Sequence, residues 1–224
     1  MRAVLLLVVV GLAGCPGPTD PATPDAPSSS DSAIPIVDAP MPGAARLIIA
    51  WATTPSVPGT TAAGHEIEDA RFRMEDLKAT VDVDPGNPNT TQDEYKLHWG
   101  ESEGPASIVF ENAPIGRYTS IVLKLDDGDN EKAFDLRGTS NDNESFKFDD
   151  SKSLSIAINC DVMLAPGQEK TIVIDIDLQT AVDAIDIDDL DSGDGVDHHL
   201  DADDEPEAME QFRNALKSAF SVRE

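Results

Sequence analysis

The chain has 224 residues and a formal net charge of -27, from 16 lysines and arginines against 43 aspartates and glutamates. This composition excludes a nucleic-acid binder, because a polyanion is attracted by clustered Lys and Arg and would be repelled by this surface. The length allows one domain with an appendage. The two cysteines, Cys15 and Cys160, are too few for a disulfide framework or a four-thiolate zinc site.

The N-terminal residues predict export and lipid anchoring. Arg2 supplies a positive charge, residues 3–10 form an unbroken apolar run, and the tetrapeptide Leu-Ala-Gly-Cys ends at Cys15. The run is too short for a transmembrane helix, which needs about 20 apolar residues, so residues 1–14 are predicted to be a signal peptide. The tetrapeptide resembles the lipobox of bacterial lipoproteins, whose cysteine is acylated and becomes the mature N-terminus. The alternative is an ordinary signal peptide cleaved before an incidental cysteine.

The resemblance implies lipidation of Cys15 with three acyl chains, which would anchor the protein in a membrane permanently. Pro16 follows the cysteine where inner-membrane retention signals of such lipoproteins usually carry Asp. We therefore expect a cell-envelope location, with the outer membrane favoured if the cell has one.

Residues 15–45 are predicted to be a disordered tether between the anchor and a folded domain. From Pro16 to Ala45 the chain has eight prolines, four aspartates and no Lys or Arg. Such a stretch buries too little apolar surface to offset the entropy of ordering it. We expect it to lift the domain off the membrane; the alternative is an unstructured segment without a role.

From Arg46 onward, short apolar alternations separated by turn residues predict β-strands. In residues 72–83 the apolar side chains occupy even positions up to Met74 and odd positions from Leu77 onward. This shift by one residue predicts a β-bulge near Glu75 and Asp76. Alternation with a period of two indicates a sheet with one face on a core and the other in water. Residues 46–180 are therefore predicted to be a mainly β domain, an antiparallel β-sandwich of about 8–9 strands. The predicted strand segments include residues 47–51, 72–83, 95–99, 107–110, 121–125, 154–160 and 172–178, of which the last two are the clearest.

Residues 112–118 contain Pro114, which can preset a turn, and Gly116, which can take a positive φ before Tyr118 begins a strand. This piece resembles the P-x-G-x-Y opening of prealbumin-like and carboxypeptidase-regulatory-like sandwich modules. Together with the closing strand at residues 171–178, this turn and strand are similar to those of a bacterial lipoprotein domain family of unknown function that has this architecture. The resemblance implies a fold and no catalytic residues. We expect Tyr118 to be a packed core ring whose hydroxyl bonds to the backbone.

Cys160 lies in register with Leu154, Ile156 and Ile158, so the alternation points it inward. No basic residue or histidine lies beside it in the sequence. We therefore expect a buried small hydrophobe rather than a reactive thiol.

Residues 181–204 are predicted to be an acidic loop, which contains two adjacent histidines and no Lys or Arg. Oxygen ligands at this density suit Ca²⁺, which takes about six to eight of them. The candidate calcium ligands are Asp186, Asp188, Asp189, Asp191, Asp194 and Asp197.

The acidic loop nevertheless fails the detailed EF-hand pattern. If Asp189 is position one, Gly193 falls at position five and Leu200 at position twelve, where the pattern has an oxygen ligand and a glutamate. A solvated, self-repelling loop is therefore preferred to a calcium site. His198 and His199 are expected to face solvent, because neighbours on an extended segment point in opposite directions and cannot share one metal.

Residues 205–222 are predicted to form a C-terminal amphipathic helix. Pro206 stands in its first turn, and Met209, Phe212, Leu216 and Phe220 recur at three- and four-residue steps. We expect this apolar stripe to pack on the chain's own sandwich; the alternative is a groove on another envelope protein.

No catalytic motif is recognisable, since G-x-S-x-G, H-E-x-x-H and phosphate-binding glycine loops are absent and His65 and His98 have no evident partners. The sequence therefore predicts a non-enzymatic, lipid-anchored envelope lipoprotein whose acidic β-sandwich acts as a binding or structural module. Its expected partners are the membrane, through the anchor, and an envelope protein or extracellular ligand. The alternatives are a calcium-binding surface protein and a hydrolase of envelope or extracellular substrates.

Overall fold

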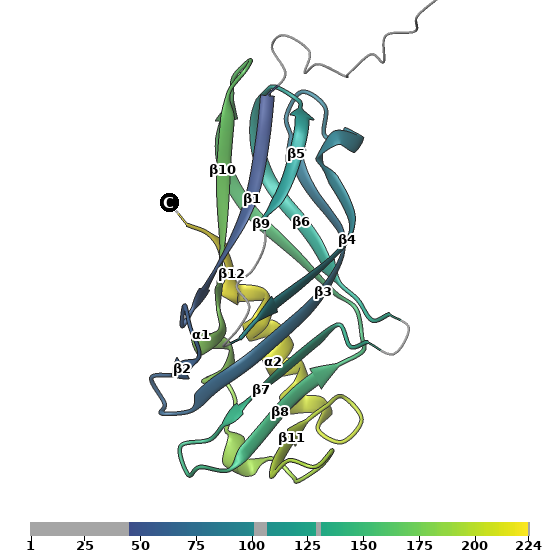
Figure 1. Ribbon diagram of the computed structural model, residues 1–224. Helices are drawn as coiled ribbons and strands as arrows, with labels where there is room; N and C mark the ends of the chain where they lie inside the picture. The colour runs from purple at the N-terminus through teal and green to yellow at the C-terminus, as the bar shows by residue number, and fades with distance from the viewer. Residues whose placement is uncertain (1–44, 101–106, 129–130, 224) are drawn as a thin grey trace, which may run out of the picture. The chain divides into compact units, whose positions relative to one another are not determined.

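The computed structural model describes residues 45–100, 107–128 and 131–223 (Figure 1). The predicted signal peptide, Cys15 and the tether up to residue 44 lie outside these residues. Within the described ranges, no helix has the length and apolar character that crossing a membrane requires.

The smaller sheet has four strands in the order β12-β10-β1-β5. Along β1, burial alternates without interruption, which puts Leu47, Ile49 and Trp51 into the core. β1 runs parallel to β10 and antiparallel to β5, and β12 adds to β10 in the antiparallel sense. The strands are β1 (Ala45–Thr54), β5 (Ile108–Ala113), β10 (Glu169–Asp177) and β12 (Phe220–Val222).

The larger sheet has eight strands and is built around the long strand β3. β4 pairs with one edge of β3. Along the opposite edge of β3, β7 pairs with the first half of the strand and β6 with the second half. β8 and β11 extend the sheet beyond β7, and β9 extends it beyond β6. The strands are β2 (Gly59–Thr60), β3 (Glu66–Val81), β4 (Thr91–Trp99), β6 (Gly116–Leu125), β7 (Phe134–Thr139), β8 (Ser145–Asp150), β9 (Leu154–Leu164) and β11 (His198–Leu200).

The bulge expected in β3 is confirmed. The register with β6 shifts between Glu75 and Lys78, and Asp76 has a φ of 52°. Burial follows the shift, because Met74 points into the core before it and Leu77 after it. One extra residue thus keeps both halves of a 16-residue strand facing the same core.

The C-terminal helix packs on the chain's own sheets, as predicted. Met209, Phe212 and Leu216 are buried, and the Phe212 ring lies 5.5 Å from Phe134 and 5.1 Å from Phe148 between centroids. The helix ends at Ala219, so Phe220 belongs to β12 rather than to the helix. The helices are α1 (Leu178–Val182) and α2 (Pro206–Ala219), with 3-10 turns η1 (Pro88–Thr90) and η2 (Ile187–Asp189).

The fold class predicted from the sequence is therefore confirmed: a mainly β domain of two sheets around one core, with a C-terminal helix. The structure adds two parallel pairings, β1 with β10 and β8 with β11. It also adds strands that the predicted segments do not include: β2, β7, β8, β11 and β12. Of these, β11 and β12 are only three residues long and so carry no readable period.

Tyr118 occupies the position expected from the Pro114–Gly116 turn. Its ring is fully buried, and its hydroxyl donates a hydrogen bond to the carbonyl oxygen of Pro114 at 2.8 Å. Gly116 has a φ of 146°, and a Cβ there would lie 2.8 Å from the Asp82 carboxylate. The turn therefore requires glycine at this position.

We expect Tyr118 to titrate far above an ordinary tyrosine, because burial raises its pKa from 10.0 to about 12. A folded-state pKa above the unfolded one gives stability that is complete below pH 10 and is lost as the pH rises through 12. Ultraviolet titration of a Tyr95→Phe variant isolates this group, since the chain has two tyrosines. Ionisation near pH 10 in the folded variant would contradict the assignment.

Cys160 points inward from β9 as predicted, but it is only half-buried. Its thiol lies 3.5 Å from the carbonyl oxygen of Tyr118. Burial, assisted by the neighbouring Asp161 carboxylate, raises the pKa of the thiol. The environment therefore disfavours the reactive thiolate.

Candidate functional site

The face of the larger sheet turned away from the core, here called the outer face, carries rows of charged side chains. Arg71 of β3 is the cross-strand partner of Asp135 of β7, which in turn is opposite Asp149 of β8. In the next row, Arg137 of β7 is opposite Lys147 of β8. Period-two alternation produces these rows, because the residues between them point into the core.

The acidic segment, residues 181–204, is anchored in the domain by its apolar residues. Their side chains are buried in the same core as the sheets, while the six candidate calcium ligands are all exposed. These six carboxylates are therefore solvated, as the composition of the segment predicts. The backbone of the segment is held against the end of the larger sheet by the buried apolar side chains (Figure 1). The buried apolar residues are Ala181, Val182, Ile185, Ile187, Leu190 and Leu200.

The six candidate calcium ligands do not converge. Asp186, Asp188 and Asp189 lie at η2, and none of them belongs to a metal-competent group among the described residues. Asp197 accepts hydrogen bonds from the hydroxyl and backbone N–H of Ser145, at 2.7 and 2.9 Å, which lower its pKa. Asp191 is likewise outside these groups, whereas Asp194 lies in one.

The two adjacent histidines are buried, which corrects the expectation that they face solvent. His198 is 7% exposed and His199 is 9% exposed. They do point in opposite directions, as an extended segment requires, but β11 pairs with β8 and both of its faces are covered. The His198 Nε2 lies 2.8 Å from the Glu144 carboxylate. His199 is opposite Lys147 of β8 and so lies on the outer face.

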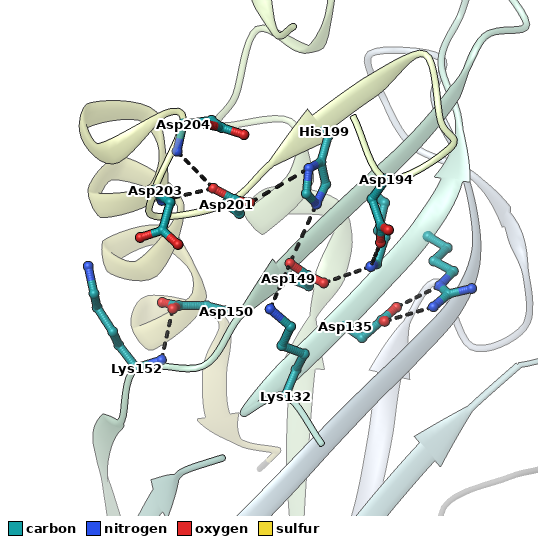
Figure 2. Close-up of polar contacts among 12 residues, drawn as sticks. Lys132, Asp135, Asp149, Asp150, Lys152, Asp194, His199, Asp201, Asp203 and Asp204 are labelled. Carbon is teal, nitrogen blue, oxygen red and sulfur yellow. Dashed lines mark hydrogen bonds and ion pairs between the residues drawn. The ribbon is translucent and has the colours of Figure 1, made fainter. Parts of the chain in front are cut away.

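His199 is the centre of a group that we call the His199 cluster. Its members come from β8, β11, the acidic segment and the residues that precede β7 and α2 (Figure 2). They line a pocket of about 390 Å³, together with Gly193. The His199 cluster consists of Lys132, Lys147, Asp149, Asp194, His199, Asp201 and Asp204.

Lys147 is the internal counter-charge of the His199 cluster. Its ammonium lies 2.7 Å from the carboxylate of Asp149 and also pairs with Asp194. Burial lowers the pKa of Lys147, but the hydrogen bonds to the two carboxylates outweigh it and leave the pKa raised. The same contact lowers the pKa of Asp194. The lysine and Asp194 are therefore both charged at neutral pH.

Asp201 is fixed by the backbone that follows it. It accepts hydrogen bonds from the N–H groups of Asp204 and Asp203, at 2.9 and 2.8 Å, and these lower its pKa. Its other oxygen lies 3.7 Å from the Nδ1 of His199. Asp201 is thus a positioned carboxylate on one side of the imidazole.

Two polar atoms of the His199 cluster are buried without a hydrogen-bond partner. They are Oδ1 of Asp149 and Nε2 of His199, which lie 3.5 Å apart. The Asp149 side chain is 3% exposed. The ammonium of Lys132 lies 3.6 Å from the same Asp149 oxygen, beyond hydrogen-bond distance. A buried oxygen without a hydrogen bond loses roughly 1–3 kcal/mol of solvation, so a ligand that bonds it directly would be favoured.

A second pocket, of about 490 Å³, lies on the outer face over β3 and β4. Its cationic walls are neutralised within the protein, since Arg73 pairs with Glu75 at 2.7 Å and Lys96 pairs with Glu131 at 2.6 Å. His98, for which the sequence shows no partner, lies 2.5 Å from the Asp69 carboxylate. None of the described residues that line this pocket has a buried polar atom without a hydrogen bond, whereas two residues of the His199 cluster do.

Sequence reasoning did not single out Lys147 and Asp149, although a local signal exists. The run from Phe146 to Asp149 alternates aromatic and charged residues, which indicates a strand with Lys147 and Asp149 on one face. What cannot be read locally is that this face meets His199, 50 residues farther along the chain, through the parallel pairing of β8 with β11.

Comparison with known protein families, curated proteins and solved structures gives no match for this chain. The site is therefore interpreted from its own geometry.

Proposed function

We propose that this protein is a lipid-anchored envelope lipoprotein that displays a non-enzymatic, mainly β binding domain. The observation that carries the proposal is the order of parts at the N-terminus: a basic residue, a short apolar run and Leu-Ala-Gly-Cys ending at Cys15. A Pro-rich stretch then separates the cysteine from β1, which begins at Ala45. Pro16 after the cysteine favours the outer membrane.

The tether sets how far the domain can stand from the membrane. Cys15 and Ala45 are 45 - 15 = 30 positions apart. If residues 15–44 form the predicted tether, a flexible chain of that length would span roughly 30 Å on average. The binding domain would therefore clear the lipid headgroups and reach ligands or proteins in the envelope.

The proposed place of binding is the His199 cluster. A buried carboxylate oxygen and a buried imidazole nitrogen face each other there without a hydrogen bond, in a pocket of about 390 Å³. Ligand sites combine a preformed concavity with a few convergent polar groups in this way. The kinship with prealbumin-like and carboxypeptidase-regulatory-like modules is part of the proposal, and the Pro114–Tyr118 turn supports it.

Replacement of Cys15 by serine is expected to abolish fatty-acid labelling and to release the protein from the membrane fraction. The reason is that acylation requires the cysteine sulfur and the anchor depends on the acyl chains. Metabolic labelling with a radioactive fatty acid, followed by membrane fractionation, measures both effects. Cys160→Ser is the matched control and should be labelled like the unaltered protein. Labelling that survives Cys15→Ser would refute the anchor.

A further inference from the structure

We propose that the His199 cluster binds one divalent transition-metal ion, best matched by Zn²⁺, through Asp149, Asp194 and His199. The inference rests on the binding role proposed above and names its ligand, but it does not depend on the lipid anchor. Among the described residues, these three side chains form a group whose ligand atoms all lie within 4.8 Å of one another.

The distance between the Asp149 and His199 atoms that lack a hydrogen bond fits a shared metal ion better than a direct hydrogen bond. Oδ1 of Asp149 and Nε2 of His199 are 3.5 Å apart and make no hydrogen bond. Ligands about 2.1 Å from a tetrahedral metal are about 3.4 Å from each other. The carboxylate and the imidazole therefore already stand at the edge length of such a site.

The charges of the His199 cluster leave room for a divalent cation. Four carboxylates, from Asp149, Asp194, Asp201 and Asp204, stand against two ammonium groups, from Lys132 and Lys147. With a neutral imidazole the excess is 4 - 2 = 2 negative charges. One divalent ion compensates this excess. Lys147 does not block it because Lys147 holds Oδ2 of Asp149 and leaves Oδ1 facing His199. Lys132 is 3.6 Å from Oδ1 and about half-exposed, so a metal ion can displace it into solvent.

The far side of the imidazole is arranged to support a metal at Nε2. Nδ1 of His199 lies 3.7 Å from the carboxylate of Asp201, which two backbone N–H groups hold in place. A metal-bound histidine usually directs its other ring nitrogen to a carboxylate or carbonyl, which fixes the ring and raises its basicity. Asp201 is placed to be that positioning residue.

The donor set favours a transition metal over Ca²⁺. Ca²⁺ takes about six to eight oxygen ligands, whereas imidazole nitrogen suits Zn²⁺ and its neighbours. The inferred site also differs from the predicted calcium ligands, since it shares only Asp194 with them.

Isothermal titration of the full, tag-free chain in detergent with Zn²⁺ tests the inference. We expect one site per chain, with affinity lowered about tenfold or more in His199→Gln and in Asp194→Asn. His98→Gln is the matched control, because it removes another histidine that contacts a carboxylate, and it should bind like the unaltered protein. Ca²⁺ should compete weakly.

Asp194 has an exposed side chain, so its variant keeps the test valid if His199→Gln folds poorly. Circular dichroism establishes that each variant is folded. The inference is overturned if the folded, unaltered protein takes up no Zn²⁺, or if Asp194→Asn and His199→Gln bind it unchanged. Failure of fatty-acid labelling at Cys15 would refute the anchor alone and leave zinc binding intact.

Discussion

Replacement of Lys147 by methionine is expected to lower the free energy of unfolding by about 3–5 kcal/mol. The lysine side chain is 10% exposed and its partner Asp149 is 3% exposed, so the pair is shielded from water. Without Lys147, the nearest cation to the Asp149 carboxylate is the half-exposed Lys132 at 3.6 Å. A buried carboxylate without a close counter-charge lowers the free energy of unfolding by far more than the intact ion pair adds to it. Urea denaturation followed by circular dichroism measures the loss.

Two further variants separate the ion pair from its surroundings. Lys147→Met combined with Asp149→Leu should recover most of the lost stability, because an apolar pair of similar volume leaves no uncompensated charge. Lys96→Met is the control on an exposed pair, since Lys96 contacts Glu131 at 2.6 Å and both side chains are about half-exposed, and its loss should be much smaller. A small effect of Lys147→Met in the otherwise unaltered protein would show that Asp149 does not depend on it.

Truncation of Phe212 to alanine is expected to destabilise the domain by about 3–5 kcal/mol. The ring is fully buried between Phe134 of β7 and Phe148 of β8, where it joins α2 to the larger sheet. Its removal loses the transfer free energy of an aromatic ring and leaves a cavity that the two strands cannot close. The midpoint of urea unfolding measures the change.

Lys217→Ala on the exposed face of the same helix is the matched control and should change the stability by less than about 0.5 kcal/mol. The chain should unfold in one transition in every variant, because α2 and both sheets share one core. A Phe212→Ala protein that loses only the helix and keeps its sheets would contradict this shared core.

The parts of the fold that the sequence predicts are those in which apolar and polar residues alternate over many positions. β10 and β9 are of this kind, and the bulge at Asp76 is readable because the phase changes within one long run. The C-terminal helix is predicted for the same reason, because its apolar residues recur at the three- and four-residue steps of an α-helix. β8 is less readable, because Lys147 and Asp149 are buried although they occupy the polar phase of the strand.

The candidate site was harder to predict because long-range pairing creates it. The sequence places the acids of residues 181–204 and the two histidines in one segment, which suggests that any ion is held within that segment. The structure instead joins His199 and Asp194 to Asp149 and Lys147, which lie in β8. A single sequence carries no signal for which strand a three-residue partner such as β11 will join.

The position of β1 determines how the domain would respond to a pull on its N-terminal end. In the proposed anchored protein, the chain enters the domain at β1, an interior strand with β10 on one side and β5 on the other. A force directed along β1 would load its nine registered positions against β10 together, rather than peel them apart in succession. Mechanical strength would thus be concentrated where the chain enters the domain.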